Sequence, residues 1–259
     1  MRIGADLSGG RTDGFVVTFD DITELQSAQR KAAWADVARR IAHEIKNPLT
    51  PIQLSAERLK RRFAREITSD PDTFRQCADT IVRHVGDIGR MVDEFSAFAR
   101  MPQPVIKPED IGRVAREALV LQKTARPQIA WRTDIPYEGL VAPCGRRLLG
   151  QALTNLLQNA ADAVAMREGD KGTIGLSVQP GDGDVRIIVT DDGIGLPQED
   201  RARLTEPYVT HKPKGTGLGL AIVKKIMEDH GGRLTLDDRP DGPGAVAALV
   251  LPAKVSDGA

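Results

Sequence analysis

The stretch Ile41-Ala-His-Glu-Ile-Lys-Asn-Pro-Leu-Thr-Pro51 carries a histidine on the polar side of a helical pattern. Apolar residues recur around it at steps of three and four, namely Val37, Ile41, Ile45, Leu49, Ile52, Ala56, Leu59 and Phe63. This spacing predicts one long helix, residues 22–67, with an apolar seam along one side. At about 100° per residue, His43 lies about 200° from Ile41, so its imidazole points away from the seam.

Two polar side chains accompany this histidine. Asn47 falls one helical turn after His43 on nearly the same side, and Glu44 lies on the flank. An exposed imidazole with a carboxylate beside it and an amide one turn away is suited to chemistry at near-neutral pH. A lone helix histidine would more simply be a solvated surface residue, so the rest of the chain has to decide between the two interpretations.

A second amphipathic helix follows a break at Thr68-Ser-Asp-Pro71. Asp70 is a suitable cap and Pro71 suits the first helical turn. The second apolar stripe, again at steps of three and four, comprises Phe74, Cys77, Ile81, Val85, Ile88, Val92, Phe95 and Phe98. We expect an antiparallel hairpin that dimerises into a four-helix bundle, because a hairpin alone buries little apolar surface. The alternative is that the stripe docks onto a second domain of the same chain.

The pattern changes after Met101-Pro-Gln-Pro104, where proline ends the second helix. Short strands then alternate with helices, which predicts a two-layer α/β domain with a mixed sheet. The expected helices cover residues 108–124, 146–166 and 220–230, and the expected strands cover 129–134, 140–142, 173–179, 185–190, 233–238 and 245–251. The fold class is therefore α+β in two domains, a helical hairpin at residues 23–100 and an α/β sandwich at 107–254, joined by a linker at 101–106 and followed by a tail at 255–259.

Composition excludes several classes of function. The 259 residues carry 36 basic and 36 acidic side chains, and the basic ones are dispersed, so we expect no nucleic-acid partner. Cys77 and Cys144 lack metal-ligand spacing and fit a reducing compartment. No apolar run approaches the roughly 20 residues that cross a bilayer, and the first residues do not resemble a signal peptide. This stretch is therefore expected to be cytoplasmic and to make no membrane contact.

Four motifs, taken together, resemble the sensor histidine kinases. His43-Glu-Ile-Lys-Asn-Pro-Leu-Thr-Pro51 is similar to their phosphoacceptor box. Asn155-Leu-Leu-Gln-Asn159-Ala, Asp191-Asp-Gly193-Ile-Gly195 and Gly215-Thr-Gly-Leu-Gly-Leu220 resemble their three nucleotide-binding boxes, in the family's order. The segment Trp34-Ala-Asp-Val-Ala-Arg-Arg-Ile-Ala-His43 and its continuation are most similar to nitrogen-regulation sensor kinases of the NtrY type.

The resemblance makes particular residues candidates for nucleotide binding. Asn155 and Asn159 project together from one helix face at a spacing of four, and amide oxygens of this kind suit Mg²⁺, with Asn159 the candidate metal ligand. Asp191 ends a strand, where its carboxylate can accept from an adenine amino group, while Gly193 and Gly195 let the backbone approach the base. The implied fold is the GHKL ATPase type.

The third box is an anion-binding loop. Gly215, Thr216, Gly217, Leu218 and Gly219 precede a helix, whose N-terminus and backbone amides can hold phosphates. The spacing matches neither a Walker A loop nor the dinucleotide fingerprint.

Residues 196–214 resemble the family's mobile ATP lid. Tyr208 stands where the lid box usually has phenylalanine, and Lys212 and Lys214 are candidates to contact the triphosphate. Asp162 stands where many relatives carry a basic residue, which argues against a phosphate contact there and favours the lid lysines.

What the resemblance implies about function is an ATP-dependent autophosphorylation of His43. The phosphoryl group would then pass to an aspartate of a response-regulator receiver domain, here NtrX-like. Glu44 would orient the imidazole or take its proton, and Asn47 would hold the water for a phosphatase reaction toward the regulator. ATP and Mg²⁺ are the implied cofactors and a homodimer the implied assembly. The alternatives are a GHKL-type ATPase without phosphohistidine chemistry and a non-catalytic dimeric scaffold.

Two further expectations concern the first residues of the chain and the helix surface beyond His43. Residues 14–19 are predicted to form one strand, which is similar to the closing strand of a PAS domain. Residues 1–22 are therefore expected to end an upstream PAS-like sensor domain, and the whole protein is expected to be a membrane-anchored sensor of the bacterial inner membrane. The alternative is a short disordered tail. Thr50 and Leu54 fall on the face of His43, and we expect them to form the receiver-docking patch together with Arg58.

Overall fold

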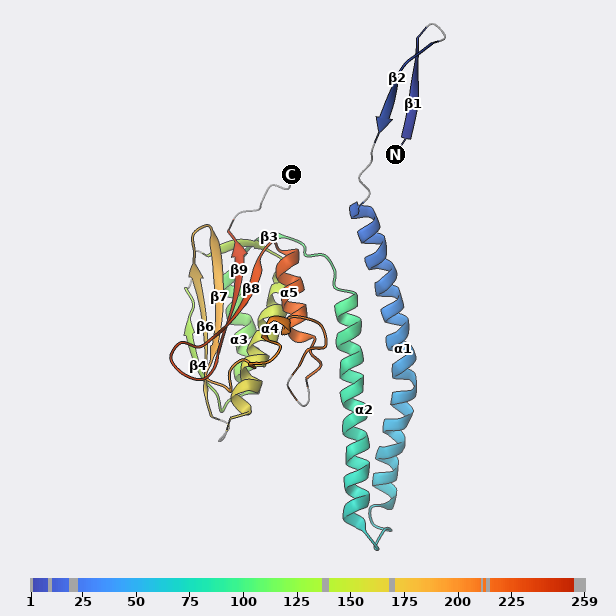
Figure 1. The fold of residues 1–259 in the computed structure, drawn as a ribbon. Coiled ribbons are helices and arrows are strands. Elements are labelled where there is room, and N and C mark those ends of the chain that lie inside the picture. The colour runs from blue at the N-terminus through green and yellow to red at the C-terminus, as the bar shows by residue number, and fades with distance from the viewer. Residues whose placement is uncertain are drawn as a thin grey trace. The chain divides into compact units, whose positions relative to one another are not determined.

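The computed structural model describes residues 2–8, 11–18, 23–136, 140–167, 171–210, 212 and 215–253, with side chains from residue 36 onward. The chain divides into two compact units, residues 1–100 and residues 101–259. Figure 1 shows the helices and strands of the two units.

The first unit contains a helical hairpin made of α1 (Thr23–Phe63) and α2 (Pro71–Ala99). The predicted cap of α2 is confirmed, because the Asp70 carboxylate accepts a hydrogen bond from the backbone N–H of Thr73 over 3.2 Å and Pro71 occupies the first turn. The first helix ends at Phe63 and not at residue 67. The carbonyl oxygen of Phe63 accepts from the N–H groups of Glu66 and Ile67 instead, in a turn that closes the helix.

Small residues line the contact between α1 and α2. The buried positions are Ala38, Ala42 and Ala56 on α1 and Ala78, Val85, Val92 and Ser96 on α2. Short side chains let two helix backbones approach closely. Two ion pairs, Lys46 with Asp93 and Lys60 with Asp79, connect the helices at their surface. The larger apolar side chains stay exposed within one chain, among them Val37, Ile41, Ile45, Ile52, Leu59, Ile81, Ile88 and Met91.

A β-hairpin precedes α1. Its strands, β1 (Arg2–Ser8) and β2 (Arg11–Thr18), pair antiparallel from Arg2 opposite Thr18 to Ser8 opposite Arg11. The strand expected at residues 14–19 is part of β2, which begins earlier, at Arg11, and its partner β1 was not predicted. Gly4 and Asp6 have low strand propensity and obscured β1 in the sequence pattern, although backbone pairing with β2 overrides that preference.

The second unit is a two-layer α/β sandwich. Its sheet has the strand order β4-β6-β7-β9-β8, with β4 (Ala130–Asp134) parallel to β6 (Thr173–Pro180) and every other pair antiparallel. The remaining strands of this sheet are β7 (Asp184–Asp191), β8 (Arg233–Asp238) and β9 (Ala245–Pro252). The sheet is mixed, as predicted.

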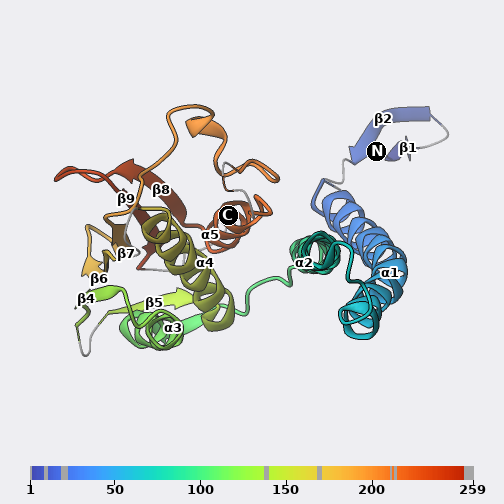
Figure 2. The same cartoon turned by 90° about the horizontal axis from the view of Figure 1, so that it is seen from below.

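Among the described residues of this unit, three helices form the other layer. They are α3 (Ile111–Ala125), α4 (Arg146–Ala165) and α5 (Gly219–Asp229), and they lie along one face of the sheet (Figure 2). The core between the layers is aliphatic: Leu149, Leu153 and Leu157 of α4 are fully buried. On the sheet side, Ile174, Leu176 and Val178 of β6 alternate with half-buried neighbours, as the period of two predicts.

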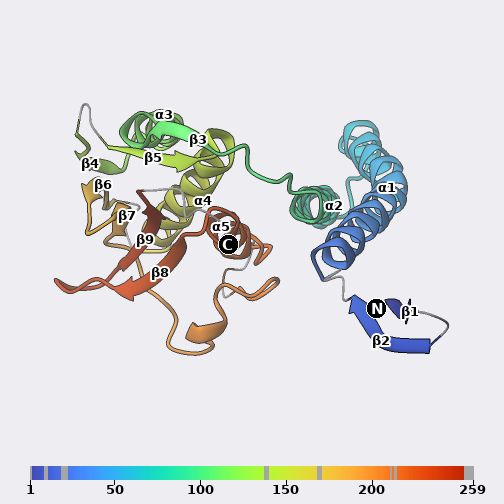
Figure 3. The ribbon, with the colours of Figure 1, turned by 90° about the horizontal axis from the view of Figure 1, so that it is seen from above.

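A small second sheet corrects one helix boundary. Strand β3 (Lys107–Asp110) pairs antiparallel with β5 (Val141–Cys144), and α3 begins only after it (Figure 3). The prediction that residues 108–110 are helical was therefore wrong, because these residues belong to β3. Pro108 resembles a first-turn proline in sequence, but the cap of α3 is Asp110, whose carboxylate accepts from the Arg113 N–H over 3.0 Å. A short 3₁₀ turn, η1 (Arg201–Arg203), lies in the segment before α5.

Candidate functional site

The first candidate site lies on the outer surface of α1. His43, Glu44 and Asn47 are all exposed, whereas the neighbouring Ala42 is buried against α2. The predicted outward direction of His43 is thus what the helix shows. Solvent access leaves the imidazole open to a second reactant, which is the minimum that a phosphoacceptor needs.

The expected docking residues follow His43 along the same helix. Leu54 is 60% exposed, and Thr50 and Arg58 are exposed as well. The Thr50 hydroxyl donates to the carbonyl oxygen of Lys46 over 3.3 Å, which fixes its rotamer against the helix. Leu54 is therefore an exposed apolar side chain one helical turn from two exposed polar ones, Thr50 and Arg58.

The second candidate site is built around α4. Asn155 and Asn159 are half-buried on the face of α4 that meets α5, since the Asn155 side-chain amide donates to the carbonyl oxygen of Gly219 over 3.4 Å. A Cβ placed on Gly219 would lie 3.8 Å from the amide nitrogen of Asn159. The structure thus brings the polar stripe of α4 to the glycine-rich loop, two motifs far apart in the sequence.

Asp191 ends β7 beside the same helix. Its side chain is 6% exposed and accepts from the Gly193 N–H over 2.9 Å, and the backbone of Ala245 donates to it as well. Burial raises the pKa of the Asp191 carboxyl above its ordinary value, and these two backbone hydrogen bonds only partly oppose that effect. A buried carboxylate with acceptor capacity left can accept a hydrogen bond from the amino group of a bound base.

Gly193 is required by a close approach of two backbones. A Cβ there would lie 2.6 Å from the carbonyl carbon of Ala163 in α4, and the next residue, Ile194, donates its N–H to the Ala163 carbonyl oxygen over 3.2 Å. Gly195 has a φ of 81°, in the left-handed region that side chains disfavour. The Asp-x-Gly-x-Gly segment is thereby fixed between β7 and α4.

The glycine-rich loop packs against the lid. Gly217 has a φ of 71°, and a Cβ on it would lie 2.6 Å from the backbone of Tyr208. Leu218 is buried and its N–H donates to the Thr216 hydroxyl over 3.3 Å, while Gly215 lies beside Thr210 of the lid. Tyr208 is 62% exposed, so its ring is free to cover a ligand. The glycine-rich loop and the lid are therefore in direct contact.

Lys212 of the lid contacts α4 directly. Its Nζ donates to Oδ1 of Asn159 over 2.8 Å and to Oδ2 of Asp162 over 3.0 Å. An ammonium group therefore occupies the place where the sequence predicted a metal, and this shows that the oxygens there suit a cation. The role of Asp162 in holding Lys212 was missed, because nothing in the local sequence pattern indicates which cation meets this carboxylate. The candidate Lys214 lies outside the described residues.

Asn159 is the residue of this site that would hold Mg²⁺. The residues that the structure describes contain no group of three or more histidine, cysteine, aspartate and glutamate side chains placed to bind a metal. An ion at Asn159 would take its other ligands from phosphate oxygens and water, which is usual for Mg²⁺ in nucleotide sites.

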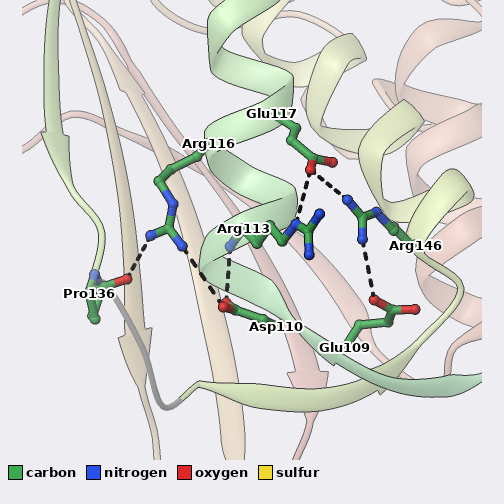
Figure 4. A network of polar contacts seen from close by, with 7 residues as sticks. All are labelled: Glu109, Asp110, Arg113, Arg116, Glu117, Pro136 and Arg146. Atoms are coloured by element: carbon green, nitrogen blue, oxygen red, sulfur yellow. Dashed lines mark hydrogen bonds and ion pairs between the residues drawn. The ribbon is translucent and has the colours of Figure 1, made fainter.

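A separate hollow of about 400 Å³ lies between α3 and α4. Beside it, Arg146 forms ion pairs with Glu117, at 2.5 Å, and with Glu109, at 3.9 Å (Figure 4). The hydrogen bond from Arg146 lowers the pKa of the Glu117 carboxyl. These charges tie the start of α4 to α3 and β3, which is a structural role.

Two family models match the chain. Residues 33–104 match the His Kinase A (phospho-acceptor) domain, and residues 145–255 match the histidine kinase-, DNA gyrase B- and HSP90-like ATPase. The first match contains His43, and the second contains all the nucleotide-site residues described above. No helix among the described residues is long and apolar enough to cross a membrane.

Curated relatives extend these matches. The chain is 55% identical to the nitrogen regulation protein NtrY of Azorhizobium caulinodans over 98% of its own length and 33% of that protein. It is 38% identical to an NtrY-like sensor histidine kinase of Rickettsia conorii, over 90% of this chain and 38% of the relative. The chain thus spans about a third of the length of these curated relatives.

Solved structures agree. The mycobacterial sensor histidine kinase MprB matches with a TM-score of 0.52 and 31% identity, over 58% of this chain and 99% of that one. The histidine kinase ThkA, in complex with the response regulator protein TrrA, has the same fold, with a TM-score of 0.62 and 24% identity over 99% of this chain and 75% of that one.

Proposed function

The chain belongs to the sensor histidine kinases, with a phosphoacceptor domain and an ATP-binding domain, and on this premise we propose that it phosphorylates its own His43 from ATP. The observation that carries the proposal is the assembly around α4. The glycine-rich loop contacts Asn155 and lies beside Asn159, and the Gly193 backbone, which bonds to Asp191, packs on the same helix, while His43 stands exposed on a separate helix.

The nucleotide is held by groups of complementary chemistry. The buried Asp191 carboxylate accepts a hydrogen bond from the adenine amino group, and the N-terminus of α5 with the amides of residues 215–219 faces the phosphates. Tyr208 and Lys212 of the lid cover the phosphates from the other side. Asn159 would hold Mg²⁺, which when bound would neutralise charge on the phosphate oxygens.

The transfer itself needs a neutral imidazole. One ring nitrogen of His43 attacks the γ-phosphorus, the bond between that phosphorus and the bridging oxygen breaks, and ADP leaves with the electron pair. The other ring nitrogen carries a proton, which Glu44, the next residue on the helix, orients or accepts. Positioning and electrostatics therefore supply most of the catalysis.

The phosphoryl group then passes to an aspartate of a receiver domain. We place the docking patch at Thr50, Leu54 and Arg58, which are exposed along the helix that carries His43. An NtrX-like regulator is the proposed partner, on the strength of the similarity to NtrY. Asn47, one turn from His43, would hold the water for dephosphorylation of that regulator.

The large apolar side chains that one hairpin leaves exposed support a homodimer. Ile41, Ile45 and Ile52 of α1 are 37%, 38% and 46% exposed, and Ile81 and Ile88 of α2 are 43% and 42% exposed. Burial of apolar surface contributes roughly 25 cal/mol per Å², so a second hairpin packed on this stripe would complete a four-helix bundle. The proposed division of the chain is the hairpin at residues 23–100, a linker at 101–106, the ATP-binding domain at 107–254 and a tail at 255–259.

Residues 1–22 are proposed to end a PAS-like sensor domain of a longer, membrane-anchored protein. The β-hairpin of β1 and β2 and the length of the relatives support this. The present chain would then be the cytoplasmic portion of an inner-membrane bacterial sensor.

The test is the chemistry of the product. Incubation with labelled ATP and Mg²⁺ is expected to leave on the protein a phosphate that is lost in acid and kept in base, as a phosphorus–nitrogen bond requires. Continuous release of inorganic phosphate without protein labelling would instead indicate a GHKL-type ATPase. Failure to bind nucleotide at all would indicate a scaffold.

A further inference from the structure

The carboxylate of Asp162 is held in one orientation by three partners. Its Oδ1 accepts from the Gln158 side-chain amide over 2.7 Å and pairs with Arg126 over 3.4 Å, while Oδ2 accepts from Lys212 over 3.0 Å. Gln158 lies one turn earlier on α4, and Arg126 lies just after α3. Two of the three contacts therefore come from rigid elements, and the third comes from the lid.

The same lysine ammonium also occupies Asn159. Asn159 and Asp162 stand three residues apart on one face of α4, and the Lys212 Nζ lies 2.8 Å from the first and 3.0 Å from the second. Lys212 and Asp162 keep only 28% and 31% of their side-chain surface exposed. A partly desolvated pair of this kind is screened less by solvent than a surface ion pair.

We propose that Asp162 is a positioning residue that holds the lid lysine on the metal-binding amide as long as no nucleotide is bound. This inference rests on the proposed nucleotide site. Asn159 Oδ1 cannot serve an ammonium group and a divalent cation at the same position, because the two like charges repel. Binding of a nucleotide with its metal therefore releases Lys212 from Asn159.

The released lysine has a new partner close by. Phosphate oxygens brought to the α5 N-terminus carry negative charge, which an ammonium on the lid can meet as a point charge. Asp162 would thus couple lid position to metal occupancy, with one lysine moving between a carboxylate and the phosphates. A ligand shifts this equilibrium only by its differential affinity for the two lid states. The free energy of the ion pair between Lys212 and Asp162, which we call the latch, therefore subtracts from the free energy of nucleotide binding.

The first arm of the test examines the full chain without nucleotide or metal. Amide hydrogen exchange at Tyr208 and Val209 reports the lid, since their N–H groups bond to the carbonyl oxygens of Gly217 and Glu206. Asp162→Asn and Lys212→Met are each expected to speed this exchange about fivefold, the order expected for one partly exposed charged hydrogen bond. The double variant should be no faster than Lys212→Met alone, because both single changes break the same ion pair between Lys212 and Asp162.

Matched controls separate the latch from general damage. Lys225→Met removes an ion pair of similar exposure, with Asp229 on α5, and should leave lid exchange at the wild-type rate. Lys212→Arg and Asp162→Glu keep the charges and should retain protection. Unchanged exchange in both Asp162→Asn and Lys212→Met would overturn the proposal, as would equal acceleration by Lys225→Met.

The second arm measures binding of a non-hydrolysable ATP analogue against Mg²⁺ concentration. Asp162→Asn is expected to lower the Mg²⁺ concentration for half-saturation about fivefold, because the ammonium competes less well for Asn159. If Asp162 instead attracts the metal, that concentration rises and the latch is overturned. A wild-type chain that binds no analogue would contradict the proposed function, whereas the exchange result would still decide whether the latch exists.

Discussion

The backbone N–H of Tyr208 donates a hydrogen bond to the carbonyl oxygen of Gly217 over 3.1 Å. This bond joins the lid to the loop that precedes α5, and the two backbones approach so closely that no Cβ fits on Gly217. Tyr208 itself has a φ of 68°, a left-handed conformation that is uncommon outside glycine. The lid is therefore attached to the glycine-rich loop by a backbone hydrogen bond and a close contact between the two backbones.

Gly217→Ala should disrupt this attachment. A Cβ would lie 2.6 Å from the Tyr208 backbone and would clash with it. The left-handed backbone conformation of residue 217 would cost about 1 kcal/mol more for a residue with a side chain. ADP affinity, measured by calorimetry, is expected to fall at least about tenfold, equivalent to about 1.4 kcal/mol. Gly183→Ala is the matched control: its φ is 78° but nothing lies within 4 Å of a Cβ there, so it should lower stability and keep binding. Equal loss of binding in both variants would contradict the account.

The two carboxamide positions should have different roles. Asn159→Ala removes the proposed metal ligand and is expected to reduce Mg²⁺-dependent autophosphorylation about a hundredfold, the upper end of what loss of a group around a bound metal costs. Asn47→Ala should leave autophosphorylation within about threefold and slow dephosphorylation of the regulator, since Asn47 lies on α1. Both rates are measured with labelled phosphate, and equal loss of autophosphorylation in the two variants would show that the division is wrong.

Asp191 predicts a pH dependence of stability with a definite sign. Burial raises the pKa of its carboxyl, so the folded chain binds a proton more readily than the unfolded chain does. Its contribution to the unfolding free energy therefore decreases as the pH rises from the ordinary aspartate pKa through the raised folded pKa, and it is constant above that value.

Asp191→Asn should remove this contribution while weakening nucleotide binding about tenfold, through loss of a charged acceptor. The free energy of unfolding is measured by urea titration, followed by Trp131 fluorescence in a Trp34→Phe background. At neutral pH the variant should be at least as stable as the parent, and in acid it should lose that advantage. The opposite result is that the stability of the variant relative to the parent is lower at neutral pH than in acid. That result would show that the ionised carboxylate stabilises the fold.

Leu54→Glu tests the docking patch. The side chain is 60% exposed, so its replacement costs little stability, but a charge there should slow phosphotransfer to the cognate receiver about tenfold. Autophosphorylation and the dimer, followed by light scattering, should be unchanged. Val120→Glu on α3 is the control, with a similar exposure of 61%. Transfer at the wild-type rate, or loss of the dimer, would remove Leu54 from the patch.

Much of the fold could be predicted because local signals agree with tertiary packing. Asp70 and Pro71 specify the start of α2 through a cap and a first-turn proline, and both act there as the sequence indicates. The alternation in β6 likewise predicts which residues face the helices. Strands β1 and β3 escaped prediction because their residues have weak strand propensity, and pairing with β2 and β5 supplies the missing stabilisation.

The candidate site could be predicted only motif by motif. Spacing shows that Asn155 and Asn159 share a helix face, and Asp191 follows from the end of a strand. The contact between Lys212 and Asp162 depends on how a long lid folds back onto α4, and no periodic pattern encodes that. The exposed direction of His43 was accessible because it needs nothing beyond helix geometry.

The central claim is that His43 accepts the phosphoryl group, and the most direct measurement is labelling of the full chain and two variants with labelled ATP and Mg²⁺. His84 is also an exposed histidine on a helix of the hairpin, so His84→Gln is the matched control. We predict acid-labile label on the wild type and on His84→Gln, none on His43→Gln, and equal nucleotide affinity in all three. Label on His43→Gln at the wild-type level would contradict the account.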